Sequence, residues 1–199
     1  RKLTAIKFSE LPFDRAIKQV RGDGKRVLAT FEDPNCGYCK RALPDIVKLV
    51  DEDPKVRLVL KELPIFGEDS EAAAKGALAA MKQNKYFEMH QKLYSESGKA
   101  DKEKVLKVAG ELGLDVDQLQ KDMESDDVKK GIEEARDLAQ KLGLQGTPLF
   151  LIGDKVIPGA PDDLHEEFDS PATIRAIADV LRGLGHEVRE LGEGRPFLE

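Results

Sequence analysis

Both cysteines of the chain lie in one Cys-x-x-Cys motif, formed by Cys36 and Cys39. An apolar, β-prone run, Val27–Phe31, precedes the motif, and residues 33–35, Asp-Pro-Asn, have the composition of a turn. Beyond the motif, apolar residues recur at helical spacing from Leu43 to Val50. This order predicts a buried strand, a turn and a helix, with the two cysteines where the helix begins.

The position of the first cysteine favours its thiolate. Unpaired N–H groups and the positive end of the helix dipole stabilise an anion, so we expect Cys36 to be the nucleophile. Cys39 follows on the side that Leu43 and Ile46 continue into the core, and it is expected to be the resolving thiol. Such an environment can lower a thiol pKa from about 8.5 to roughly 3.5–7.5, which would make Cys36 mostly thiolate near neutral pH. Because a thiolate attacks disulfides, the motif predicts thiol-disulfide exchange.

The motif is also compatible with two roles that involve no thiol-disulfide exchange. A Cys-x-x-Cys pair can form half of a zinc site, but a structural zinc site takes four ligands, and His90, His165 and His186 lack the required spacing. The cysteines could also be ordinary buried residues, as cysteine often is. His90 is expected to be a surface or capping residue of a helix.

A second motif, far downstream, begins with Thr147 and Pro148. An apolar run follows it and ends at a Gly-Asp turn, after which a second short run ends at Pro158. Because proline is tolerated at the start of a strand but not within a central one, Pro148 marks where this strand begins. A cis peptide bond before Pro148 is compatible with the sequence, which does not show it.

The two motifs together resemble DsbA-like thiol-disulfide oxidoreductases. The order of strand, Cys-x-x-Cys, helix, strand, long helical segment, Thr-Pro, hairpin and last helix is similar to that family from Phe31 to Gly159. The resemblance implies an α/β thioredoxin fold with an inserted helical subdomain. It also implies that Cys36 is the nucleophile, Cys39 the resolving cysteine and Pro148 a cis-proline that faces the disulfide.

The same resemblance implies how a substrate would bind. Thr147 would offer backbone hydrogen bonds to an extended substrate segment beside Pro148, and Gly37 and Tyr38 would contact it from the motif. The partners it implies are unfolded or partly folded proteins and a membrane-bound or thioredoxin-like redox partner. It implies no cofactor and no metal.

Three features differ from the oxidase prototype. Thr30 stands where that prototype has a buried acidic residue, so its proton-relay device is expected to be missing; Glu32 and Asp33 are interpreted as solvated charges of the turn. The Gly-Tyr dipeptide and residues 11–18 and 31–34 resemble disulfide isomerases of the DsbC and DsbG type. Those isomerases carry an N-terminal dimerisation domain, and because none precedes Arg1, a monomeric dithiol oxidase is expected over an isomerase or reductase.

Two classes of function without protein redox chemistry also stay open. The chain could be a binding module, either a copper-handling protein that uses the two thiolates as soft ligands or a chaperone-like binder. A glutathione-handling enzyme is a further option, although the sequence shows no basic pocket for the carboxylates of that peptide.

The expected organisation is a thioredoxin-fold domain of residues 1–68 and 143–199, interrupted by a helical subdomain of residues 69–142. Residues 1–9 are expected to form an edge strand, Leu11–Val20 a short helix and Lys55–Leu63 a second core strand, with Phe66 filling the core.

Residues 168–188 resemble the opening unit of ATP-grasp ligases, which makes the chain a candidate composite. Helices are expected from Ser70, over Lys85–Tyr94, Asp101–Leu112 and Val116–Met123, from Ser125 to Leu142, and from Ser170.

The charge and hydropathy patterns exclude some partners. The net charge is -6 and no basic cluster occurs, which argues against nucleic acid. No apolar run approaches the roughly 18 residues of a membrane span, and no signal peptide is recognisable. The family resemblance implies export to the periplasm, so the chain is expected to be the mature form.

Overall fold

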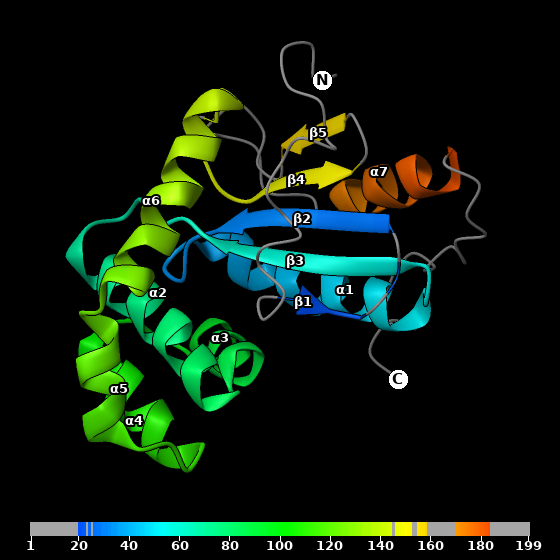
Figure 1. Cartoon of the computed structure of the whole chain (residues 1–199). Coiled ribbons are helices and arrows are strands. Elements are labelled where there is room, and N and C mark those ends of the chain that lie inside the picture. Colours follow the sequence, from blue (N-terminus) through cyan, green and yellow to red (C-terminus); the bar gives the residue numbers. More distant parts are fainter. Residues whose placement is uncertain are drawn as a thin grey trace.

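The computed structural model describes residues 20–22, 24, 26–144, 146–152, 155–158 and 170–183 (Figure 1). A mixed five-stranded sheet forms its centre, with the strand order β1-β3-β2-β4-β5. Strands β2 and β3 are parallel neighbours, whereas the other three neighbouring pairs are antiparallel. The strands span Val20–Arg21 (β1), Arg26–Glu32 (β2), Val56–Glu62 (β3), Leu149–Ile152 (β4) and Lys155–Pro158 (β5).

Both faces of β2 are buried, which explains its nearly continuous apolar sequence. Leu28 belongs to a core cluster that includes side chains of α1 (Gly37–Glu52) and α7 (Ser170–Gly183). Phe31 belongs to a second cluster, to which α6 (Asp126–Lys141) contributes. Helices therefore pack on both sides of the strand that leads to the cysteines.

Between β3 and β4 the chain forms a group of helices, which gathers where β2 and β3 end (Figure 1). Helix α2 contacts α3, α4, α5 and α6. Its small residues permit this close packing: a β-carbon on Gly76 would lie 2.4 Å from Cγ1 of Val105. The group comprises α2 (Glu68–Ala80), the 3-10 helix η3 (Met81–Gln83), α3 (Tyr86–Ser95), α4 (Lys102–Glu111), α5 (Val116–Met123) and α6.

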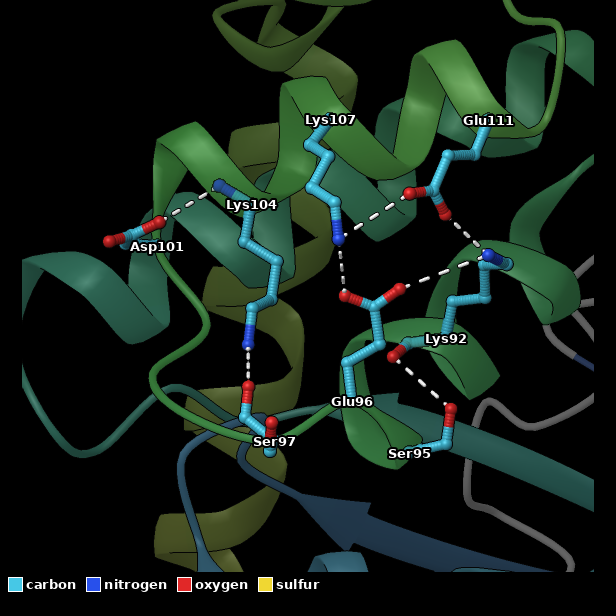
Figure 2. A network of polar contacts seen from close by, with 8 residues as sticks. All are labelled: Lys92, Ser95, Glu96, Ser97, Asp101, Lys104, Lys107 and Glu111. Atoms are coloured by element: carbon cyan, nitrogen blue, oxygen red, sulfur yellow. Dashed lines mark hydrogen bonds and ion pairs between the residues drawn. The ribbon is translucent and has the colours of Figure 1, made fainter.

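A network of ion pairs and hydrogen bonds joins α3 to α4 on the surface (Figure 2). Glu96 pairs with Lys107 at 3.2 Å, and Lys92 pairs with Glu111 at 2.5 Å. Nζ of Lys104, on α4, donates to the carbonyl oxygen of Ser97 in the loop between the two helices. Single surface pairs contribute little to stability, and here several of them join α3, α4 and the loop between the two helices.

The structure confirms the thioredoxin fold with helices inserted between its strands, and each helix expected between residues 70 and 142 is present. One expected boundary is wrong, because Val20 pairs with Val59 in β1 and does not end a helix. The strand expected at residues 1–9, the helix before Val20 and the segment after Gly183 lie outside the described residues. Within the described ranges, no helix is both long and apolar enough to cross a bilayer.

Candidate functional site

Cys36 is the N-cap residue of α1, as the sequence predicts. Its backbone is extended, and its Sγ accepts a hydrogen bond from the backbone N–H of Cys39 at 3.2 Å. The turn before it is closed by a hydrogen bond from the N–H of Cys36 to the carbonyl oxygen of Asp33. Both cysteines are free thiols; Cys36 is 3% exposed and Cys39 is fully buried.

The two thiols have very different acidities. The pKa of Cys36 is lowered to about 7, chiefly by its hydrogen bond with the Cys39 side chain; burial opposes this, and the side chain of Thr147 supports it. The pKa of Cys39 is raised well above that of an ordinary thiol by burial, by Cys36 and by the charge of Glu32. The direction for Cys36 agrees with the prediction, but a pKa near 7 leaves it about half thiolate at neutral pH. In this pair, the Cys36 thiolate at the helix start can attack a disulfide, while Cys39 stays protonated until it resolves the mixed disulfide.

Thr147 and Pro148 lie directly against the first cysteine. The peptide bond between them is cis, and Sγ of Cys36 donates to the carbonyl oxygen of Thr147 at 3.4 Å. The sheet register brings them together, because Phe31 at the end of β2 pairs with Leu149 at the start of β4. The structure thus places four of the predicted site residues, Cys36, Cys39, Thr147 and Pro148, in one region.

The two residues between the cysteines occupy the first turn of α1. Gly37 is exposed, and a β-carbon there would lie 3.6 Å from a guanidinium nitrogen of Arg41. Tyr38 is half-buried, and the guanidinium of Arg41 stacks over its ring, 4.8 Å from the centroid. A cation over an aromatic face is a weak but orienting contact, so the Tyr38 ring is held beside the motif.

Glu32 and Asp33 are not solvated charges of the turn; both are fully buried. Glu32 is the last residue of β2, where it accepts a hydrogen bond from Oγ1 of Thr30 at 2.9 Å. A buried acid is therefore present beneath the motif, two residues further along the strand than in the oxidase prototype, and Thr30 binds it. Position 30 itself carries no acid, but the interpretation of Glu32 as a solvated charge is wrong.

His90 is also fully buried and lies between two carboxylates, which corrects its interpretation as a surface residue. Its Nε2 lies 3.1 Å from Oε2 of Glu32, and its Nδ1 lies 2.5 Å from Oε1 of Glu62. Burial lowers the pKa of His90, but the two carboxylates outweigh burial and raise it to about 9. Tyr86 donates to Glu62 at 2.7 Å, and the ring of Tyr94 stacks on the imidazole with centroids 4.1 Å apart.

Asp33 accepts hydrogen bonds from four donors around the motif. Two are the backbone N–H groups of Ile65 and Phe66. Ile65 is 46% exposed and Phe66 57% exposed, so Phe66 does not fill the core as expected. The loop that carries these apolar side chains is held to the catalytic turn, a link that was not predicted from the sequence.

Comparisons with known proteins agree with this geometry. The chain is 43% identical to a thioredoxin-like oxidoreductase from Silicibacter pomeroyi, with a TM-score of 0.72 over 82% of this chain and 91% of that one. It is 27% identical to the thiol-disulfide exchange protein alpha-DsbA2 from Wolbachia pipientis, with a TM-score of 0.74 over 86% of this chain and 89% of that one.

A curated relative, the "Probable thiol:disulfide interchange protein DsbC" of Bordetella avium, is 46% identical over 87 residues. The match covers 44% of this chain and 30% of the length of that relative. The model of the DSBA-like thioredoxin domain matches residues 27–168, a span that holds every residue of the site described above. The chain therefore belongs to the DSBA-like thioredoxin domain family of thiol-disulfide oxidoreductases, which confirms the resemblance seen in its sequence.

Proposed function

We propose that this chain is a protein thiol-disulfide oxidoreductase that donates a Cys36–Cys39 disulfide to the thiols of other proteins. The observation that carries the exchange itself, in either direction, is the unequal pair of thiols: Cys36 at a helix start with a pKa of about 7, and Cys39 buried with a raised pKa. Such a pair lets one sulfur exchange with an external partner while the other waits to resolve the product.

As an oxidase, the chain would react in two exchanges. A substrate thiolate attacks Sγ of Cys36, the Cys36–Cys39 bond breaks, and Cys39 leaves as a thiolate that takes up a proton. A second substrate thiolate then attacks the substrate sulfur of the mixed disulfide and expels the Cys36 thiolate. The substrate loses two electrons, which the chain holds as a dithiol until a redox partner that itself carries a disulfide reoxidises it.

The proton of Cys39 needs a carrier, because its raised pKa disfavours a free thiolate. Glu32 lies close enough for its charge to act on Cys39, and its other contacts are Thr30 and His90. We assign Glu32 the transfer of this proton, toward Cys39 when the disulfide opens and away from it when the disulfide forms. His90 holds the carboxylate in place.

Substrates would be extended segments of unfolded protein. Gly37, Tyr38, Thr147 and Pro148 are the proposed contacts beside Cys36, and backbone recognition would make substrate sequence secondary. Because protein disulfides persist in oxidising compartments, the periplasm is the proposed location. The division into a thioredoxin domain of residues 1–68 and 143–199 and a subdomain of residues 69–142 is likewise proposed.

Isomerase or reductase activity is a second candidate. In both, the Cys36 thiolate attacks a substrate disulfide; in a reductase Cys39 then loses its proton and resolves the mixed disulfide, whereas in an isomerase another thiolate of the substrate attacks the substrate sulfur and expels the Cys36 thiolate. The pKa of about 7 for Cys36 favours this candidate, because it matches the pKa of about 7 for the thioredoxin nucleophile and lies far above the value of about 3.5 for DsbA. The match to a relative named DsbC points the same way.

The reduction potential separates the two directions. The chain would be equilibrated in glutathione buffers, and the free thiols of Cys36 and Cys39 counted. A potential near the DsbA value of about -120 mV would support the disulfide donor, and one near the thioredoxin value of about -270 mV would leave a reductase. Turnover of a reduced, unfolded protein should be lost in Cys36→Ser; retained turnover would overturn both candidates.

A further inference from the structure

The proton that Cys39 exchanges in the proposed reaction has no direct access to solvent. Cys39 and the buried cluster of polar residues around its carrier are each at most 3% exposed; this cluster consists of Glu32, Glu62, Tyr86, His90 and Tyr94. While a mixed disulfide lasts, the sulfur of Cys36 is bonded to the substrate and cannot take up the proton. The reaction therefore requires a route between the buried cluster and water.

Tyr94 belongs to the buried cluster through its ring and not through its hydroxyl. The ring stacks on the imidazole of His90, with centroids 4.1 Å apart and 22° between the planes. The hydroxyl oxygen is buried and has no hydrogen-bond partner among the residues that the structure describes. Burial raises the pKa of Tyr94, and the charges of Glu62, Glu32 and Cys39 raise it further, so the hydroxyl keeps its proton within electrostatic reach of carrier and thiol.

A groove between α1 and α3 leads to the same tyrosine from outside. Its volume is about 390 Å³, which is room for several water molecules, since each takes up about 30 Å³ in the liquid. Of the buried cluster, Tyr94 is the member that lines it. The other lining residues include Leu43, Pro44 and Val47 on the turns of α1 that follow Cys39, and Gln91 and Ser95 on α3.

A buried hydroxyl is nearly always hydrogen-bonded, to protein or to water. Because the hydroxyl of Tyr94 has no partner among the described protein groups and its side chain lines a groove wide enough for water, solvent in the groove is the partner that remains. A tyrosine hydroxyl is both a donor and an acceptor, so it can accept a proton on one side while it donates one on the other.

We propose that Tyr94 relays protons between water in the groove and Glu32. This rests on the proposed function and completes its proton transfer. When the disulfide opens, the Cys39 thiolate takes a proton from Glu32, Glu32 takes the hydroxyl proton of Tyr94 through a bound water, and the tyrosine oxygen takes a proton from water in the groove. Resolution reverses each step. One proton crosses, Tyr94 ends as it began, and no electron moves along this route.

The test separates rate from equilibrium in the full chain, because a proton route changes how fast Cys39 exchanges its proton and not the redox balance. Reduced chain mixed with dithionitrobenzoate releases one thionitrobenzoate when Cys36 attacks and a second when Cys39 resolves. Tyr94→Phe keeps the ring and removes the hydroxyl. Its second phase, followed by stopped flow, should slow about tenfold, less than the roughly 100-fold expected for loss of the carrier itself. Its equilibrium constant with glutathione should change by less than twofold.

Tyr86→Phe is the matched control. Tyr86 also faces His90 and carries a hydroxyl, but that hydroxyl donates to Glu62 at 2.7 Å and the residue does not line the groove. Its second phase should stay within twofold of the wild type.

The solvent isotope effect gives a readout that a merely structural role would not move. Once the relay is lost, proton transfer limits resolution, so deuterium oxide should slow the second phase of Tyr94→Phe more than that of the wild type. An unchanged second phase in Tyr94→Phe would overturn the proposal. So would a slower phase with an equal shift of the equilibrium, or one without the larger isotope effect. If the wild type releases no second thionitrobenzoate, the proposed function itself fails.

Discussion

The thiol of Cys36 donates to the carbonyl oxygen of Thr147 at 3.4 Å, although 111 positions separate the two residues in the chain. The contact follows from the sheet, since β2 ends beside the start of β4. It places a backbone carbonyl and a cis-proline at the sulfur that reacts, while the backbone N–H of Cys39 approaches the same sulfur at 3.2 Å. The electrostatics of Cys36 are therefore set by the first turn of its own helix and by the distant Thr147–Pro148 segment, and they can be tested one group at a time.

Replacing the resolving cysteine should make Cys36 a weaker acid. The hydrogen bond with the Cys39 side chain is the largest cause of the lowered pKa of Cys36, so Cys39→Ala should raise that pKa from about 7 toward the ordinary thiol value of about 8.5. The ultraviolet absorbance of the thiolate, followed through a pH titration, gives the value. Cys39→Ser, which keeps a donor, should shift it less. An unchanged pKa in Cys39→Ala would show that the helix start alone sets the acidity.

Removing the carboxylate of Glu32 distinguishes a proton carrier from a mere charge. If Glu32 carries the proton of Cys39, Glu32→Gln should slow release of a mixed disulfide by about 100-fold, the lower end of general acid-base catalysis. If Glu32 only raises the pKa of Cys39 through its charge, the same variant should resolve faster. Stopped-flow kinetics of the resolving step measures this rate. Glu62→Gln is the matched control, because Glu62 binds the same His90 from the other side.

The buried histidine should make stability fall at alkaline pH. The pKa of His90 is about 9 in the folded chain, above its ordinary 6.5, because Glu32 and Glu62 outweigh burial. Its contribution is therefore complete below about pH 6.5 and is lost as the pH rises through about 9, with a size on the order of 3 kcal/mol.

Urea unfolding of a Cys36→Ser/Cys39→Ser background, in which no thiol titrates, would isolate this effect. Tyr86 and Tyr94 face the same imidazole, so the pH range should stop short of tyrosine ionisation. Adding His90→Gln should flatten the profile between pH 6 and 9. A profile that keeps its slope without His90 would assign the titration to another group.

Packing inside the helical insertion predicts opposite effects for two glycines. A β-carbon on Gly76 would lie 2.4 and 2.8 Å from the two methyl carbons of Val105, so Gly76→Ala should destabilise the chain by about 1–3 kcal/mol. At Gly131 the nearest atom, Cδ1 of Leu78, would lie at an ordinary 3.5 Å. Gly131→Ala should therefore be neutral or stabilise by up to about 1 kcal/mol. Equal unfolding midpoints would contradict the close packing of α2 on α4.

The strand, the turn and the helix around the motif could be predicted because each depends on local sequence. The patterns that predict them all lie close to Cys36 in the sequence: an apolar run, a turn composition and apolar residues at helical spacing. The helix begins where these patterns predict it. The helices of the insertion were predictable for the same reason. Val20 was not, because its strand forms only by pairing with Val59.

The polar network beneath the motif could not be predicted from these patterns. Glu32 ends a strand that is buried on both faces, where charge gives no signal of orientation, and its partner His90 is 58 positions away. Phe66 was expected in the core because it is large and apolar. In the structure its side chain is 57% exposed, and its N–H donates to Asp33, 33 positions earlier. Buried polar partners are set by tertiary structure, and a single sequence does not show them.

Trapping of a mixed disulfide tests most directly the central claim, that Cys36 exchanges with proteins and Cys39 resolves the product. The Cys39→Ser chain would be mixed with an unfolded protein that contains a disulfide, and the products analysed by mass spectrometry without reductant. We expect a stable adduct of the two proteins linked through Cys36, and none from Cys36→Ser. An adduct linked through Cys39, or no adduct from either variant, would contradict the account.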